Sequence, residues 1–307
     1  MTEQKSLEGK LKKIDRRGWT LRPYKLWGSD KPCPPRLVVN VYKGCEFAHK
    51  YCYVKRCVKP QKGFRAHLQD RVKEAKKLGL EDVLVIVSSS TDPFQPIERK
   101  QKDSLFALET LLSNRFSVLV MTRNPQMLLE DEYARIIRNP KLYIDVSITS
   151  LHENDPNSIF YSATTPPLNE TYASIKKLSE IGKYIRIKIE PIVPTTDEIK
   201  GQTKEELDEI VRLSKEAGAK KIISKTMRLN KDMPNFMQDK LMGYYLKNGV
   251  EEGYGDIMNH TLSYEIKRRL LTPVYEACAK YDIPFCACVD ADVFAGKTVS
   301  CSFEEEK

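Results

Sequence analysis

The stretch RLVVNVYKGCEFAHKYC, residues 36 to 52, joins an apolar run to a short segment that is dense in metal-ligating side chains. Residues 36–42 are mostly branched and apolar, as in a β-strand that is buried on both faces. The segment that follows contains Cys45, His49 and Cys52, and Cys57 lies shortly after them. This stretch therefore predicts a strand whose carboxyl end carries a metal site.

The pattern of this first strand recurs along the chain, with helical periodicity between the repeats. Apolar strands are predicted at residues 36–42, 82–88, 116–121, 142–148, 184–193 and 219–225. Helices are predicted at residues 65–79, 97–113, 126–138, 167–181 and 203–217. Strands that alternate with helices form a parallel sheet with right-handed connections. We therefore expect an α/β fold, a partial (β/α)6 barrel of the TIM type.

Three regions are expected along the 307 residues. Residues 1–35 are predicted to be a basic N-terminal extension, and residues 36–225 the partial barrel. Residues 226–307 are predicted to combine an irregular insertion up to residue 262, a helix near 263–281 and a cysteine-containing C-terminal segment.

The composition of the chain bears on the cellular compartment of the protein and on its binding partners. The formal net charge is +9, and the N-terminal residues are the most basic part of the chain. This patch either contacts nucleic-acid phosphates or is a solvated basic surface; its residues are Lys10, Lys12, Lys13, Arg16 and Arg17. No segment approaches the roughly 20 apolar residues that span a membrane, and the N-terminus lacks an apolar signal core. We therefore expect a cytoplasmic protein without a membrane partner. In that compartment thiols are kept reduced, so we expect the eight cysteines to bind metal rather than to form disulfides.

Polar residues follow nearly every predicted strand. They occur in SSSTDPFQP (88–96), TRNP (122–125), TSLHEND (149–155), EPIVPTTDE (190–198) and SKTMRLN (224–230). The carboxyl ends of parallel strands in such barrels carry the reactive groups, whereas the opposite rim mainly contributes stability. We expect the functional site at this rim.

These motifs also resemble a known family. The loop CEFAHKYCY, residues 45–53, resembles the CxxxCxxC loop that follows the first strand in radical S-adenosylmethionine enzymes. Further stretches resemble the group of spore photoproduct lyase and its "DNA repair photolyase" relatives; they are STDPFQP (90–96), MTRNP (121–125), SITSL (147–151) and EPIVP (190–194). The resemblance covers roughly residues 36–225.

The resemblance implies a [4Fe-4S] cluster whose fourth iron binds the amino and carboxylate groups of S-adenosylmethionine. It implies reductive cleavage of this cofactor, with an electron from a donor such as ferredoxin or flavodoxin. The resulting 5′-deoxyadenosyl radical abstracts hydrogen from a substrate, which is unidentified here and for which nucleic acid is the first expectation. In the family pattern Cys45 and Cys52 are cluster ligands. The residues placed near the cofactor are Tyr53, Ser90, Thr91, Asp92, Thr122, Arg123, Ser147 and Glu190.

The sequence departs from the family motif at the middle ligand, where His49 replaces a cysteine. Histidine binds iron in Rieske centres, so His49 is the first candidate for the third ligand. Cys57 is an alternative ligand, and a degenerate or replaced cluster is the third interpretation.

A second group of cysteines, Cys286, Cys288 and Cys301, lies near the C-terminus. Soft thiolates at this spacing suit an auxiliary iron-sulfur cluster or a zinc ion. Cys278 occupies an apolar helical position, which is typical of a cysteine that packs as a small hydrophobe.

A different class of function fits the same cysteines. Cys45, His49, Cys52 and Cys57 would form one closed four-ligand site in a non-catalytic zinc or iron-sulfur protein that binds nucleic acid. Metal content and cofactor cleavage distinguish this hypothesis from the enzyme.

Overall fold

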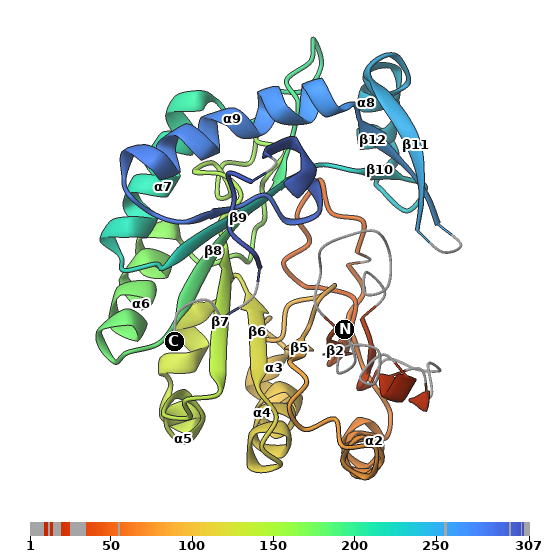
Figure 1. The fold of residues 1–307 in the computed structure, drawn as a ribbon, viewed down its shortest axis with the longest axis vertical. Helices are drawn as coiled ribbons and strands as arrows, with labels where there is room; N and C mark the ends of the chain where they lie inside the picture. Colours follow the sequence, from red (N-terminus) through yellow and green to blue (C-terminus); the bar gives the residue numbers. More distant parts are fainter. Residues whose placement is uncertain are drawn as a thin grey trace.

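One curved sheet of eight strands runs through the molecule (Figure 1). The computed structural model describes residues 9–11, 13–14, 20–24, 35–54, 56–254, 257–294, 296–301 and 303. The strands lie in the order β1-β2-β5-β6-β7-β8-β9-β13. Their bounds are β1 Arg22–Pro23, β2 Leu37–Val39, β5 Val85–Val87, β6 Val118–Thr122, β7 Leu142–Ser147, β8 Ile185–Ile192, β9 Lys221–Thr226 and β13 Phe285–Cys286.

The predicted partial barrel is confirmed. β2, β5, β6, β7, β8 and β9 are the six expected strands, and each pairs in parallel with the next. The sheet extends further at both edges, because β1 pairs with β2 in the antiparallel sense and β13 pairs with β9 in parallel. Both added strands contain only two residues, which is too short for a recognisable pattern.

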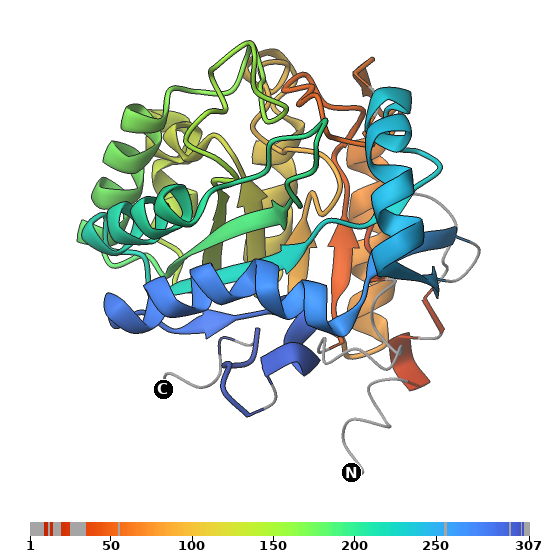
Figure 2. The same ribbon diagram turned by 90° about the horizontal axis from the view of Figure 1, so that it is seen from above.

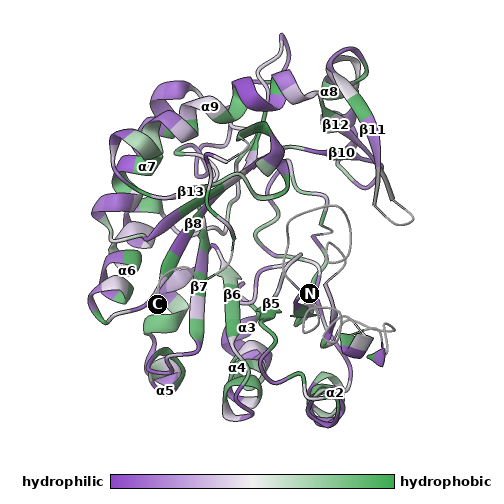
Figure 3. Ribbon diagram, viewed as in Figure 1, coloured by the Kyte–Doolittle hydropathy of each residue, from purple (hydrophilic) through white to green (hydrophobic). Residues whose placement is uncertain are grey.

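Helices lie along the outer side of the curved sheet, as Figures 1 and 2 show from two directions. They are α2 Phe64–Lys77, α4 Asp103–Ser113, α6 Leu168–Glu180, α7 Lys204–Glu216 and α9 Tyr264–Lys280. Hydrophobic residues are concentrated along the strands, and hydrophilic residues are frequent on the outward helix surfaces (Figure 3). The core between these layers is therefore shielded from water on the helical side.

Two helix predictions are wrong in detail. The expected helix 97–113 is interrupted at Lys102, whose φ of 55° separates α3 Glu98–Gln101 from α4. The expected helix 126–138 consists of short turns, η1 Pro125–Leu129, η2 Asp131–Tyr133 and α5 Ala134–Ile137. Glu130 has an extended conformation between the first two turns, so a continuous helix cannot form.

The described part of the segment predicted to be irregular, residues 226–254 and 257–262, forms regular elements. It contains β10 Leu229–Asn230, α8 Asn235–Asn248, β11 Gly249–Tyr254 and β12 Ile257–Leu262, and the strands form a separate sheet. The buried residues of α8, which are Met237, Leu241 and Tyr245, lie at i, i+4 spacing and pack in a second core with Tyr51 of the cysteine loop. The prediction failed because the apolar stripe of α8 is so narrow.

The described flanks of the chain pack on the barrel core. Leu11 and Leu21 on the N-terminal side and Val274 and Phe285 on the C-terminal side belong to the main hydrophobic cluster. Of the basic N-terminal residues, Lys12, Arg16 and Arg17 lie outside the described residues. The division into residues 1–35, 36–225 and 226–307 stays a prediction.

Glu98 connects the second and third repeats of the barrel. Its side chain is fully buried, and its carboxylate accepts hydrogen bonds from the Tyr42 hydroxyl and from the Tyr133 hydroxyl at 2.8 Å. It also accepts from the amides of Ser104 at 2.9 Å and Leu105 at 3.0 Å, in the first turn of α4. These amides have no partner within the helix, so the carboxylate stabilises the start of α4.

We expect Glu98→Ala to lower the free energy of unfolding by about 2–4 kcal/mol, because four donors, three of them buried, lose their acceptor. Chemical denaturation measures this change. Glu109→Ala is the control, since Glu109 is exposed on α4 and its loss should change the stability by less than about 0.5 kcal/mol. Equal effects of the two substitutions would show that Glu98 contributes no more than a surface residue.

Candidate functional site

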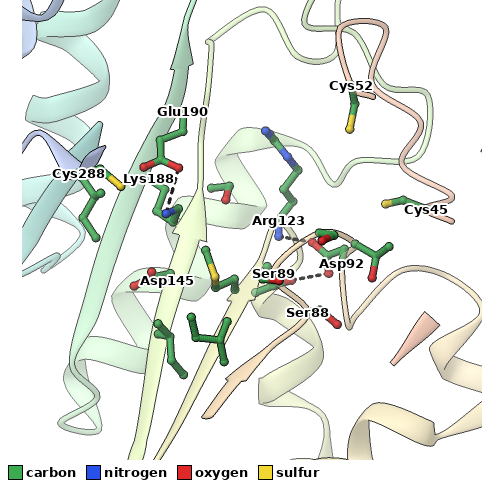
Figure 4. A pocket seen from close by; sticks show the side chains of 18 of the residues that line it. Cys45, Cys52, Ser88, Ser89, Asp92, Arg123, Asp145, Lys188, Glu190 and Cys288 are labelled. Carbon is green, nitrogen blue, oxygen red and sulfur yellow. Dashed lines mark hydrogen bonds and ion pairs between the residues drawn. The ribbon is translucent and has the colours of Figure 1, made fainter. Parts of the chain in front are cut away.

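A cavity of about 230 Å³ lies on the concave side of the sheet and reaches the carboxyl ends of the strands. The predicted site residues that line it are Cys45, His49, Cys52, Ser90, Thr91, Asp92, Thr122, Arg123, Ser147, Glu190, Cys288 and Cys301. Figure 4 shows Cys45 and Cys52 at one side of the cavity and Cys288 with Glu190 at the other. Three predicted residues, Tyr53, Cys57 and Cys286, are not among those that line it, and Tyr53 is 47% exposed.

The cysteine loop is held at its base by a small ribbon. β3 Tyr42–Lys43 pairs with β4 Lys59–Pro60, and the loop between them carries Cys45 and Cys52. Burial and the nearby Asp92 raise the pKa of the Cys45 thiol to about 12, and burial also raises the pKa of Cys52. Buried thiols of this kind become thiolates when a metal compensates their charge. Cys57 is exposed.

His49 is buried beside these thiols, with 6% of its surface exposed. Its Nε2 atom is 3.1 Å from the Thr165 hydroxyl and 4.0 Å from a carboxylate oxygen of Glu153. Burial, followed by the nearby Arg123, holds the pKa of His49 well below its usual value. The imidazole is therefore neutral, which is the form that binds metals, and its Nδ1 atom makes no hydrogen bond to the described residues.

The side chain of Arg123 joins the cysteine loop to the strand ends. Arg123 donates to Glu153 at 2.6 Å, and its second nitrogen donates to the Tyr51 hydroxyl and the Thr149 hydroxyl, each at 2.6 Å. The same oxygen of Glu153 accepts from the amide of Thr149 at 2.6 Å. Sequence reasoning missed Glu153, although it lies in the TSLHEND motif directly after His152.

Asp92 organises the neighbouring strand end. It accepts hydrogen bonds from the Phe94 amide at 2.8 Å, the Thr122 hydroxyl at 2.8 Å and the Arg123 amide at 2.6 Å. Burial raises the pKa of this carboxyl group to about 6 despite these donors. Asp92 therefore holds the β5 and β6 loops together, and it faces the cavity from this position.

The opposite wall is charged. Lys188 lies 3.0 Å and Lys225 lies 3.3 Å from one carboxylate oxygen of Glu190. Although burial disfavours its charge, these lysines hold the pKa of Glu190 below its usual value. The other oxygen, Oε1, is buried and has no hydrogen-bond partner among the described residues.

Below this wall, Arg186 forms two hydrogen bonds with Asp145, at 2.7 and 2.9 Å. Sequence reasoning missed Asp145, Arg186, Lys188 and Lys225, which all line the cavity. A signal was present, because charged residues alternate with isoleucine in IRIKIE, residues 185–190. Alternate residues of a strand point to the same face, so this pattern indicates a polar inner face.

The C-terminal cysteines separate into two kinds. Cys278 is buried in the main hydrophobic core, as its helical position predicted. The Cys286 and Cys301 sulfurs are 2.8 Å apart, and Cys288 and Cys301 line the cavity. Within the described residues, no group of three or more His, Cys, Asp or Glu side chains is already spaced around a metal position. The helices among these residues include none that is long and apolar enough to cross a membrane.

The comparisons with known proteins identify similar structures but no similar sequence. No protein-family model and no curated protein sequence matches the chain. The chain resembles a mutant of spore photoproduct lyase with dinucleoside spore photoproduct, with a TM-score of 0.64 and 14% identity over 89% of this chain and 79% of that chain. Another structure, spore photoproduct lyase complexed with dinucleoside spore photoproduct, gives a TM-score of 0.62 at 14% identity, with the same coverage of both chains.

A second type of enzyme shares the architecture. Streptococcus suis SuiB bound to S-adenosylmethionine matches with a TM-score of 0.53 and 15% identity, over 82% of this chain and 51% of that chain. Identities this low establish the architecture and leave the reaction open. The chain therefore has the fold of radical S-adenosylmethionine enzymes, the partial barrel that spore photoproduct lyase and SuiB share.

Proposed function

We propose that the protein is a radical S-adenosylmethionine enzyme that removes a hydrogen atom from a substrate in the cavity. The bound [4Fe-4S] cluster and S-adenosylmethionine would supply the 5′-deoxyadenosyl radical for this step. The observation that carries the proposal is the placement of Cys45, His49 and Cys52 together on the wall of one polar cavity, within the fold that these enzymes use.

Cys45, Cys52 and His49 are the proposed cluster ligands. The bond between His49 Nε2 and Thr165 supports ligation through Nδ1, because a hydrogen bond at one ring nitrogen fixes the tautomer and the orientation of a metal-binding histidine. Exposure of Cys57 weighs against the alternative ligand and against the closed four-ligand site. The loop has to adjust its sulfur and nitrogen positions when a cluster binds.

The remaining wall suits the polar parts of S-adenosylmethionine. Three hydroxyl-bearing residues, Ser90, Thr91 and Ser147, line the cavity. The partnerless Oε1 of Glu190 fits a donor such as a ribose hydroxyl or an adenine amino group. Asp92 contributes by positioning Thr122 and the Arg123 backbone through hydrogen bonds. Tyr53, which follows Cys52, stays a predicted neighbour of the cofactor.

Charge in the cavity favours an anionic substrate. Its cations are Arg36, Arg123, Arg186, Lys188 and Lys225, and its carboxylates are Asp92, Asp145 and Glu190. Five positive and three negative groups line the cavity, and Glu153 neutralises Arg123 from the wall, so an excess of one positive charge remains to attract phosphate. A dinucleoside photoproduct in one structural neighbour supports the same substrate class, nucleic acid. A cytoplasmic location and a ferredoxin or flavodoxin donor stay predictions.

The proposal is tested on the full chain purified and reconstituted without oxygen. We expect about four irons per chain in the loop site and slow release of 5′-deoxyadenosine when the protein is reduced with S-adenosylmethionine present. Iron analysis and chromatography measure the two quantities. A single tightly held zinc at this loop without cofactor cleavage would overturn the enzyme in favour of the metal-containing binding protein.

A further inference from the structure

Three cysteines that are distant from the first loop meet at the other side of the cavity. Cys286 ends β13, Cys288 follows it, and Cys301 belongs to the C-terminal segment. The Cys286 and Cys301 sulfurs are 2.8 Å apart, and the Cys288 amide lies 3.4 Å from the Cys286 sulfur. Cys288 and Cys301 both line the cavity, so the three cysteines lie close to one another.

Contacts within the fold bring Cys301 close to Cys286 and Cys288. The Val299 amide donates to the Phe285 carbonyl at 2.9 Å, and Arg186 donates to the Cys301 carbonyl at 2.7 Å. Phe303 stacks on Tyr143 with the ring centroids 4.2 Å apart. Together these contacts hold the C-terminal segment against the sheet.

The backbone at Cys288 is unusual. Its φ of 48° lies in the left-handed region, which residues other than glycine seldom adopt. Such conformations persist where the surrounding structure imposes them, and they are concentrated at functional sites.

Charged groups of both signs lie near the three sulfurs, because the Glu190 carboxylate is close to Cys288 as well as the cations. Arg186 interacts electrostatically with Cys286 and Cys301, and Lys188 and Lys225 interact with Cys288. Three thiolates in a buried place need cations or a metal to offset their charge. Arg186 is already paired with Asp145 and the two lysines with Glu190, so these cations offset little of the thiolate charge and a metal ion would supply the rest.

We propose that Cys286, Cys288 and Cys301 form a second metal centre with three thiolate ligands and a position that is open to the cavity. Each thiol loses its proton when the metal binds. Three protein ligands and one open position are typical of metal sites that contact a substrate, whereas four ligands are typical of structural sites. The metal site itself is independent of the proposed function, but its contact with the substrate rests on that function.

The sulfur spacing allows a single zinc ion with a small movement. Two sulfurs on one tetrahedral zinc are about 3.8 Å apart, so Cys286 and Cys301 would separate by about 1 Å. A disulfide between them, with sulfurs about 2.0 Å apart, is the competing outcome and would leave Cys288 alone.

The test uses the full chain carrying Cys45→Ala and Cys52→Ala, which removes the first site. After anaerobic incubation with zinc, or with iron and sulfide, this protein should retain about one zinc or about four irons. Metal analysis and the visible spectrum identify which one binds. Addition of Cys286→Ser, Cys288→Ser and Cys301→Ser should abolish retention, whereas addition of Cys278→Ser instead should preserve it.

Two results would overturn the second centre. One is protein without bound metal under both conditions although its circular dichroism is native. The other is a Cys286–Cys301 disulfide, found by mass spectrometry, that persists in place of metal. Cofactor cleavage is measured separately in the unmodified chain, so failure of the enzyme proposal and failure of this site give different results.

Discussion

His49→Ala should lose most of the iron at the first site, whereas Cys57→Ala should keep it. The two residues differ in position. His49 is buried on the cavity wall with the two cysteines, whereas Cys57 is exposed outside the cavity. Removal of an iron ligand opens one corner of a cluster that has only three protein ligands. Iron analysis and electron paramagnetic resonance of the anaerobically reconstituted proteins measure the loss, including conversion to a three-iron form.

His49→Cys is the matched variant for this experiment. It restores three thiolates, so the cluster should form and its reduction potential should fall, because the added negative charge disfavours another electron. The ligand assignment would be wrong if Cys57→Ala emptied the site and His49→Ala left its spectrum unchanged. In that case the imidazole either packs against Thr165 or contacts the substrate.

The second large effect is expected at Glu153. Its removal leaves the buried Arg123 without a counterion and the Thr149 amide without an acceptor. Loss of one partner of a buried ion pair costs about 3–5 kcal/mol, so Glu153→Ala should lower the free energy of unfolding by this amount. Urea denaturation of the iron-free protein under reducing conditions measures the change.

Glu276→Ala supplies the comparison for Glu153. Glu276 pairs with Lys204 at 2.8 Å, but both side chains are exposed. Exposed pairs contribute about 0–1 kcal/mol, so this variant should be nearly as stable as the unchanged protein. If the two glutamate variants were equally stable, the Arg123–Glu153 pair would not tie the cysteine loop to the strand ends.

Much of the barrel could be predicted because its pattern is local. Strands 82–88, 116–121 and 142–148 are short apolar runs bounded by polar residues, and a strand buried on both faces requires such a run wherever it occurs. The same holds for the amphipathic helices α6 and α7. Cys45 and Cys52 were recognisable because their spacing lies within one loop, and the parallel order of the strands then placed that loop at the carboxyl rim.

The charged half of the cavity depended on contacts between distant residues. Lys188, Glu190 and Lys225 meet across two adjacent strands, and Arg123 reaches Glu153 and Tyr51 from a third. An ionisable residue in a strand has no local signature that tells which partner it will find. The sheet register decides this, and register is a property of the assembled sheet.

By itself, the sequence determined the α/β class, the order of the six parallel strands and the loop that carries Cys45, His49 and Cys52. The tertiary structure alone decided that α8 and its sheet are ordered, that β13 extends the barrel, and that Cys288 and Cys301 share a cavity with the first cysteine loop. Periodicity records which residues are buried together within one element, because that depends on neighbours a few positions away. Which elements meet depends on packing free energy summed over the whole core, so residues far apart in the chain acquire a common site only when it folds.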